Sequence, residues 1–138
     1  MTKATTCWVL VLALTLGACA IRPTGYQTPE GALGPYSGAA VSGQFVFVSG
    51  KVGPAGLPFA DQVRGAIEGI DRSMQRAGLK LNHVVMVTVY LTDMDRYDEF
   101  NDIYAEIMPQ PYPARACVEV SALPGDRLVE VVAIASRR

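Results

Sequence analysis

Arg115 follows a stretch of the chain in which prolines restrict the backbone. It follows three prolines in the stretch PQPYPARACVEV, residues 109–120, and opens a run that alternates like a β-strand. Pro111 and Pro113 could hold the guanidinium in a defined direction, and its planar, permanently charged fork suits a carboxylate. The alternative is an ordinary salt bridge at the surface or at an interface, because most arginines are exposed.

Glu130 is the second candidate for chemistry. It interrupts an apolar run at residues 128–134 that is otherwise built for burial. A buried carboxylate is costly unless it is paired or protonated, and such a group suits a general base or acid. The alternatives are a carboxylate at the exposed start of the strand and a structural partner for an arginine. We take Arg115 and Glu130 as the candidate catalytic residues.

Cys117 lies two residues beyond Arg115 and therefore on the same strand face, close enough to share a pocket. The only histidine is His83, so no His–Cys arrangement supports a nucleophile, and a small buried hydrophobe is the simpler interpretation. Motifs for nucleotides, metalloproteases or zinc are missing from the sequence, so no cofactor or metal is expected. The remaining polar candidates, each more often structural, are Tyr36, Ser49 and Asn101.

The hydrophobic pattern predicts the elements that position these residues. Val63, Ile67, Ile70, Met74 and Ala77 recur at helical spacing, and Gly78 suits the C-cap that ends this helix. In the second helix the predicted core stripe is Tyr97, Phe100, Ile103, Tyr104 and Ile107. The full prediction is strands at 36–42 and 45–50, a helix at 60–77, a strand at 83–92, a helix at 95–108, and strands at 115–121 and 128–135.

The predicted order ββαβαββ indicates an α+β sandwich with both helices on one face of the sheet. Its strands are apolar on both faces, so we expect the other face to pack against another subunit. With 12 basic and 13 acidic side chains and no basic cluster, the chain is not expected to bind nucleic acid.

The N-terminus has the pattern of an export signal: Lys3, an apolar stretch at 8–16, then small residues and a cysteine. The stretch is shorter than the ~20 residues of a transmembrane helix. Residues 16–19, Leu-Gly-Ala-Cys, resemble a bacterial lipobox, which predicts a signal peptide over 1–18, lipidation of Cys19 and a tether over 19–33. By the same resemblance to bacterial lipoproteins, Ala20 in place of aspartate after the cysteine favours the outer over the inner membrane, facing the periplasm. The alternative is a plain secretory signal and a soluble periplasmic or secreted protein.

Five segments in this order resemble the RidA (YjgF) family of enamine/imine deaminases. They are GPYS at 34–37, FVSG at 47–50, VTVYLTDM at 87–94, NDIY at 101–104 and YPARACVEV at 112–120. The similarity extends from about residue 31 to the C-terminus, so residues 34–138 form the predicted domain.

The resemblance implies a chorismate-mutase-like fold that assembles as a homotrimer, with ligand clefts between subunits and no cofactor. It implies that Arg115 grips the carboxylate of a 2-enamino or 2-imino acid and that Glu130 positions or activates water, leaving ammonia and a 2-oxo acid. A non-catalytic module that binds small carboxylates in the same cleft is the alternative. The positions that match cleft residues of the family are Tyr36, Ser49, Asn101 and Cys117.

Four departures from the family pattern bear on specificity and source of substrate. Lys51 and Gly38 stand where the family usually has glutamine, and the loop at 53–58 is shorter than usual. We expect Lys51 to point to solvent, because lysine is rarely buried; the alternative is a charge beside the cleft that widens tolerance for acidic ligands. An export signal would also separate the protein from the cytoplasmic enzymes that release enamines.

Overall fold

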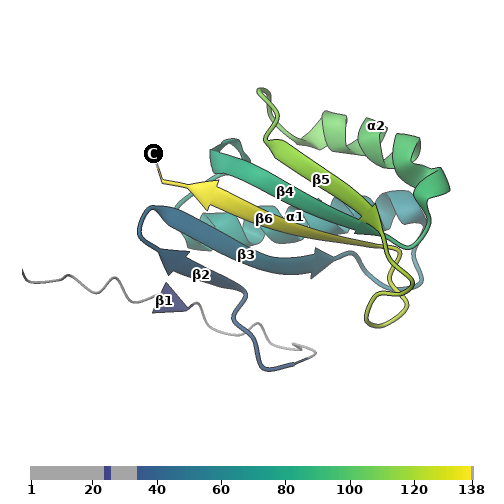
Figure 1. Ribbon diagram of the computed structural model, residues 1–138, viewed down its shortest axis with the longest axis horizontal. Coiled ribbons are helices and arrows are strands. Elements are labelled where there is room, and N and C mark those ends of the chain that lie inside the picture. The colour runs from purple at the N-terminus through teal and green to yellow at the C-terminus, as the bar shows by residue number, and fades with distance from the viewer. Residues whose placement is uncertain (1–23, 26–33, 138) are drawn as a thin grey trace, which may run out of the picture.

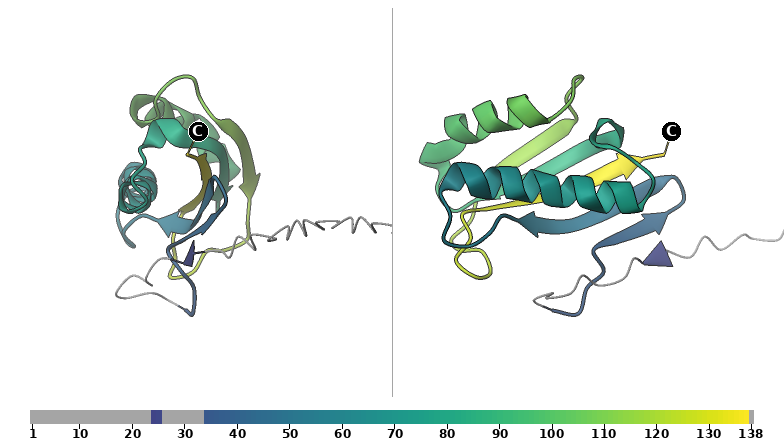
Figure 2. Two further views of the ribbon diagram at one scale, coloured as in Figure 1. Left: turned by 90° about the vertical axis from the view of Figure 1, so that its left-hand side faces the viewer. Right: turned by 180° about the vertical axis from the view of Figure 1, so that it is seen from behind.

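Six strands form one sheet in the order β1-β2-β3-β6-β4-β5, and two helices lie against one of its faces (Figures 1 and 2). The computed structural model describes residues 24–25 and 34–137. The strands are β1 (Thr24–Gly25), β2 (Ala39–Ser42), β3 (Phe45–Val52), β4 (Val84–Leu91), β5 (Ala114–Glu119) and β6 (Val129–Ser136). The helices are α1 (Phe59–Arg76) and α2 (Tyr97–Ile107), with short 3-10 turns η1 (Leu81–His83) and η2 (Met94–Arg96). The predicted α+β order is confirmed, with β1 added.

Strand β1 falls inside the stretch predicted to be a tether. It pairs antiparallel with β2, where Thr24 is level with Val41 and Gly25 with Ala40. Two residues are too few to show a strand periodicity, so the sequence pattern did not reveal the pairing. The predicted signal peptide, the lipidation site Cys19 and the rest of the tether lie outside the described residues.

Strands β2 and β3 form the predicted hairpin. Ser42 pairs with Phe45, and Gly43 has φ = 57°, a left-handed conformation that glycine adopts without steric cost. The prediction that the first strand begins at residue 36 is wrong. Pro35 has no N–H for a ladder, and the chain bends at 34–38 before β2 begins.

Helix α1 buries the predicted stripe and ends as predicted. Gly78 has φ = 74°, and its N–H donates to the carbonyl of Gln75 at 2.9 Å while that of Leu79 donates to Met74 at 2.9 Å. Helix α2 begins later than predicted because residues 94–96 form the separate turn η2, in which the Asp93 carboxylate accepts from the N–H of Asp95.

Strand β5 lies at the edge of the sheet and runs parallel to β4, whereas β6 is inserted between β3 and β4. The last two strands are therefore not neighbours, although a short connection at 120–128 joins them. Side chains that alternate along β6 show the two faces of the sheet: Val131 and Ala133 are buried beneath the helices. Arg115 and Glu130 sit on strands separated by β4.

The face of the sheet away from the helices is apolar and open. Phe45, Phe47 and Val118 on this face are 38%, 44% and 42% exposed. The predicted packing of this face against another subunit stays a prediction at this stage. Within the described residues, no helix combines the length and apolarity needed to cross a membrane.

Candidate functional site

Arg115 occupies the helix-facing side of the edge strand β5. It is level with Val87 of β4, which is level with the buried Ala133 of β6. At the edge of the sheet its guanidinium reaches the aromatic face of α2. The carbon Cζ lies 4.9 Å from the ring centre of Tyr104, 5.5 Å from that of Phe100 and 5.7 Å from that of Tyr97, distances at which rings attract a cation.

Hydrogen bonds fix the guanidinium at one nitrogen. Nη2 donates to Oδ1 of Asn101 at 2.7 Å and to the Tyr97 hydroxyl at 3.2 Å. Within the described part of the chain, Nε and Nη1 donate to no protein group. These two nitrogens remain available for an anionic ligand, so the arrangement can orient a carboxylate without first breaking the bond to Asn101.

Cys117 shares a pocket with Arg115, as its position two residues along the strand predicts. The pocket has a volume of about 630 Å³ and is lined by Met94, Asp95, Tyr97, Asp98, Arg115 and Cys117. Burial raises the pKa of the Cys117 thiol, and the neighbouring Arg115 only partly opposes this effect. The thiol form is therefore favoured, which makes Cys117 a poor nucleophile.

A second, smaller pocket is also lined by Arg115. It has a volume of about 340 Å³ and is lined by Asn101, Tyr104, Ala105, Tyr112, Pro113 and Arg115. Burial raises the pKa of Tyr104, an effect that Arg115 opposes and Tyr112 reinforces. Tyr104 is therefore neutral, and it contacts the guanidinium of Arg115 through its aromatic ring rather than through a charge.

A second group of predicted residues gathers around an irregularity in β3. Between Val48 and Lys51 the strand inserts an extra residue, so that Ser49 and Gly50 together oppose one residue of β6. The Ser49 hydroxyl donates to the carbonyl of Ser37 at 2.6 Å, which ties the bulge to the segment that carries Tyr36.

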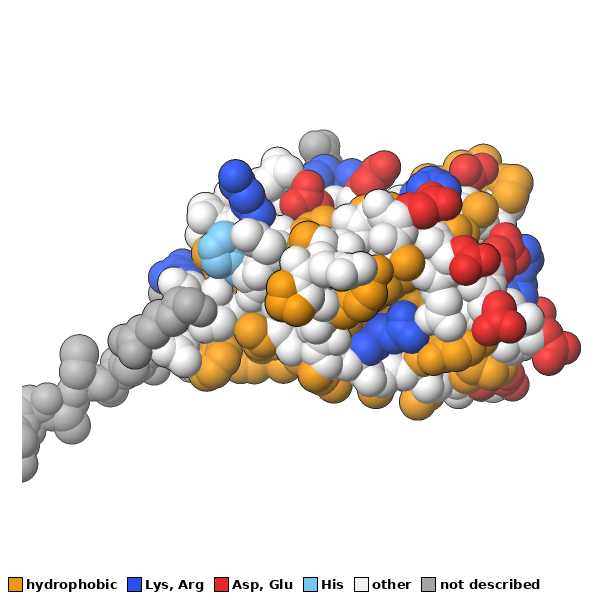
Figure 3. Space-filling view, turned by 90° about the horizontal axis from the view of Figure 1, so that it is seen from above, with side chains coloured by type: hydrophobic (Ala, Val, Ile, Leu, Met, Phe, Trp, Pro, Cys, Tyr) orange, Lys and Arg blue, Asp and Glu red, His pale blue; other side chains and the backbone are white. Residues whose placement is uncertain are grey.

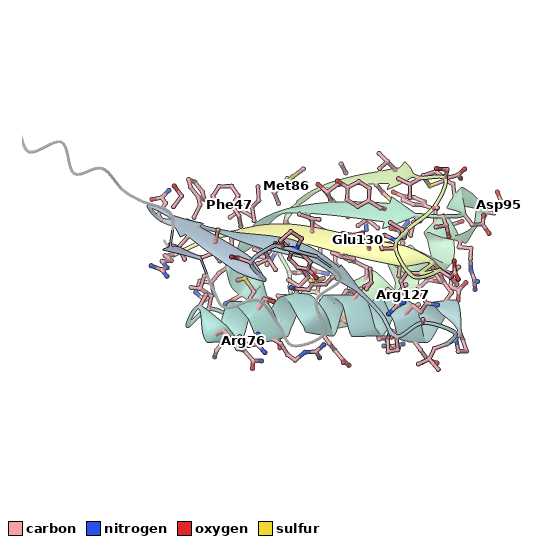
Figure 4. All side chains as sticks on the ribbon, turned by 90° about the horizontal axis from the view of Figure 1, so that it is seen from below. Phe47, Arg76, Met86, Asp95, Arg127 and Glu130 are labelled. Atoms are coloured by element: carbon pink, nitrogen blue, oxygen red, sulfur yellow. The ribbon has the colours of Figure 1, made fainter. Side chains whose placement is uncertain are left out.

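Glu130 reaches directly over Gly50. A Cβ added at Gly50 would lie 2.6 Å from the carboxyl carbon Cδ of Glu130 and would overlap its Oε1, so only glycine leaves room for the carboxylate. Here a pocket of about 270 Å³ is lined by Tyr36, Ser49, Gly50, Val52, Pro124 and Glu130. Figure 4 shows Glu130 on β6 in the middle of the sheet.

The predicted site residues therefore form two groups on opposite faces of one sheet. Glu130 is level with Val52 and Tyr90, on the open face, whereas Arg115 is level with Val87 on the helix-covered face. Tyr36 and Ser49 line the pocket of Glu130, and Asn101 and Cys117 lie beside Arg115. Within one chain the two candidate catalytic groups do not meet.

Lys51 does not point freely to solvent, so that expectation is wrong. Its stem packs over Gly69 of α1, whose missing Cβ leaves room for it, and Nζ donates to the carbonyl of Gly38 at 3.3 Å. Burial lowers the pKa of Lys51, and the guanidiniums of Arg76 and then Arg72 lower it further. Lys51 faces the helices, whereas the pocket of Glu130 lies on the open face.

Two residues of the candidate site were not predicted from the sequence. Tyr97 was placed in the core stripe of the second helix, but it is 37% exposed and its hydroxyl accepts from Arg115. Its position at the first turn of α2, where a helix meets the sheet edge, was the available signal. Gly50 could be recognised only from the approach of Glu130, which no sequence pattern contains.

Comparison with known proteins places this geometry in a family. A family sequence model described as Endoribonuclease L-PSP matches residues 27–137. A RutC family protein of Pyrococcus horikoshii is 42% identical over 111 residues, which cover 75% of this chain and 87% of that protein. TdcF of Escherichia coli K12, named as a candidate reactive intermediate deaminase, is 32% identical over 120 residues, covering 80% of this chain and 93% of TdcF.

Solved structures of related proteins have the same fold as this chain. The crystal structure of YEO7 from yeast superposes with a TM-score of 0.79 at 30% identity, covering 85% of this chain and all of that one (100%). Escherichia coli TdcF with bound serine gives a TM-score of 0.73 at 32% identity, covering 78% of this chain and 92% of that one. The predicted RidA-type fold is confirmed. The family model spans most of the sequence, and this chain covers most of the length of the solved structures of YjgF and RidA proteins that it matches. The chain therefore belongs to the RidA (YjgF) family.

Proposed function

We propose that the protein hydrolyses 2-imino acids, which interconvert with 2-enamino acids, to 2-oxo acids and ammonia. The observation that carries the proposal is the guanidinium of Arg115, fixed by Asn101 and Tyr97 with Nε and Nη1 left for a ligand. The relation to TdcF, a candidate reactive intermediate deaminase whose structure holds serine, supports a ligand of amino-acid size.

An imine carbon is already electrophilic, so the site mainly has to orient the substrate and deliver water. Arg115 binds the carboxylate next to that carbon and sets its direction. The surrounding rings of Phe100 and Tyr104 lie at cation–π distance from the guanidinium and help to hold it in place.

Glu130 is the proposed general base. Its carboxylate takes one proton from a water molecule while the oxygen of that water forms a bond to the imine carbon. The electron pair of the C=N double bond moves to nitrogen, which gains a proton, and a carbinolamine results. Glu130 then transfers the hydroxyl proton to the nitrogen, which becomes an ammonium group, the C=O bond forms, and the C–N bond breaks as the nitrogen leaves as ammonia. Atoms and charges balance with water as the only co-reactant.

The proposed site requires two chains. Because Arg115 and Glu130 lie on opposite faces of the sheet, a cleft containing both needs Arg115 from one protomer and Glu130 from its neighbour. We propose that the open face bearing Phe47 and Val118 packs in a homotrimer, which would cover these exposed apolar side chains and bring the two groups together.

The test couples the purified protein to an amino-acid oxidase that generates imino acids in situ. The wild type should accelerate formation of the 2-oxo acid, and Arg115→Ala should abolish the acceleration. Arg72→Ala is a matched control, because Arg72 is exposed on α1 and lines neither pocket of the site. A wild type that accelerates no imino acid would refute the deaminase.

A non-catalytic carboxylate-binding module gives a different result in the same samples. It would bind a 2-oxo acid saturably and lose that binding in Arg115→Ala, but it would show no turnover. The placement of Glu130 over the glycine bulge favours the enzyme, since simple binding does not need a carboxylate held there.

We further propose that the protein is exported as a lipoprotein through Cys19 and works in the cell envelope, facing the periplasm. The lipobox-like residues 16–19 support this proposal. Expression of the full chain in a bacterial host with labelled palmitate should label the wild type and leave Cys19→Ser unlabelled. Equal labelling of the two proteins, or none in either, would contradict lipidation.

A further inference from the structure

We infer that Asp95 and Asp98 make the ligand pocket select against acidic side chains, so that the preferred substrates are 2-imino acids with neutral or basic side chains. This inference rests on the proposed function, because it assumes that Arg115 holds the ligand's carboxylate. The carboxylate is common to all 2-imino acids, and the inference concerns which side chains the pocket accepts beside it.

The two aspartates line the same pocket as Arg115, which we propose binds the ligand's carboxylate. The pocket of about 630 Å³ is lined by Arg115 and Cys117 and also by Asp95 and Asp98. Its volume far exceeds that of a carboxylate group, so the rest of the ligand shares the space with the two aspartates. Figure 3 shows acidic side chains gathered at the end of the molecule where α2 begins, and Figure 4 labels Asp95 at this end.

Neighbouring cations do not neutralise these aspartates. Within the described part of the chain, neither Asp95 nor Asp98 forms an ion pair. Arg96, the adjacent cation, is bound to Glu99 at 2.7 Å and lies over the ring of Phe59 at 4.3 Å. Among the described residues that line the pocket, Arg115 is the only cation, and it is the group that the ligand's carboxylate would neutralise.

A bound 2-imino acid therefore leaves two negative charges facing its side chain. Each unit charge about 7 Å from a charged side chain changes affinity by roughly threefold in water, so two aspartates amount to roughly sevenfold at low salt. The effect disfavours an acidic side chain and favours a basic one by the same factor. Salt weakens it, because the Debye length is about 8 Å at physiological ionic strength.

The test measures binding of two stable 2-oxo acids by calorimetry at low salt: 2-oxobutyrate, with a neutral side chain, and 2-oxoglutarate, with an acidic one. We expect the wild type to prefer 2-oxobutyrate, and the ratio of the two affinities to fall at least about fivefold in Asp95→Asn/Asp98→Asn. The two ligands also differ in size, but this difference affects the wild type and the variant equally. It therefore cancels when the affinity ratios of the two proteins are compared.

The control Asp61→Asn/Asp71→Asn removes the same charge from α1, where neither residue lines this pocket, and should leave the ratio unchanged. An unchanged ratio in the pocket variant, or an equal shift in the control, overturns the inference while the carboxylate clamp stands. A wild type that binds neither 2-oxo acid overturns this inference, and it removes the proposed function as well only if the oxidase-coupled assay shows no acceleration.

Discussion

Substituting Gly50 by alanine tests whether the bulge exists to hold the carboxylate of Glu130. The new methyl group would lie 2.6 Å from Cδ of Glu130 and overlap Oε1, so the carboxylate has to retreat by at least about 1 Å to reach ordinary contact distance. A misplacement of about 1 Å in a catalytic geometry costs on the order of a hundredfold in rate. We therefore expect kcat of Gly50→Ala to fall at least about a hundredfold.

The fold should survive this change. Gly50 is not among the glycines with positive φ, and the obstructing atoms belong to the end of a flexible side chain. Alanine in a strand also removes freedom from the unfolded chain, worth about 0.5–1 kcal/mol in favour of folding. Urea unfolding should accordingly show a free energy of unfolding within about 1 kcal/mol of the wild type.

A double-mutant cycle separates the proposed cause from general damage. In a Glu130→Ala background the carboxylate is gone, so Gly50→Ala should lower the residual rate less than about twofold. The rates are measured in the oxidase-coupled assay at high enzyme concentration. A Gly50→Ala enzyme with nearly wild-type kcat, or an equal loss in both backgrounds, would refute the reasoning.

Three further changes probe the clamp, a buried cation and the open face. Asn101→Ala removes a hydrogen bond to a charged group, worth about 1.5–3 kcal/mol, so KM should rise roughly ten- to a hundredfold; a loss confined to kcat would contradict this. Because the pKa of Lys51 is lowered in the folded state, the unfolded state binds more protons between that pKa and about 10.5. In urea titrations across this pH window, the free energy of unfolding of the wild type should therefore rise with pH relative to that of Lys51→Met. Parallel profiles for the two proteins would contradict this. Phe47→Glu should dissociate the assembly in light scattering, whereas Leu57→Glu, equally exposed but in a loop, should not; an intact Phe47→Glu assembly argues against packing on this face.

The elements that follow simple periodicity were predictable from the sequence. The stripe of Val63, Ile67, Ile70 and Met74 is buried in α1, and Gly78 ends this helix in the left-handed conformation expected of a C-cap. Such signals are local, because one residue and its neighbours three or four positions away contain them.

Features that depend on distant parts of the chain were not predictable. The insertion of β6 between β3 and β4 separates Arg115 from Glu130, and the register of each strand decides the face of its side chain. Tyr97 shows the same limit at the level of one residue. Its spacing fits a core stripe, yet its place at the helix start leaves the hydroxyl at the guanidinium of Arg115.

The placement of Arg115 and Glu130 on opposite faces of one sheet has a genetic consequence. With the proposed two-chain cleft, Arg115→Ala and Glu130→Ala should each be inactive alone, but a mixed assembly would contain clefts built from the intact half of each. Random mixing of equal amounts in a closed ring restores about a quarter of the clefts. Two defective copies of the gene could thus complement each other in one cell, although neither encodes a working protein.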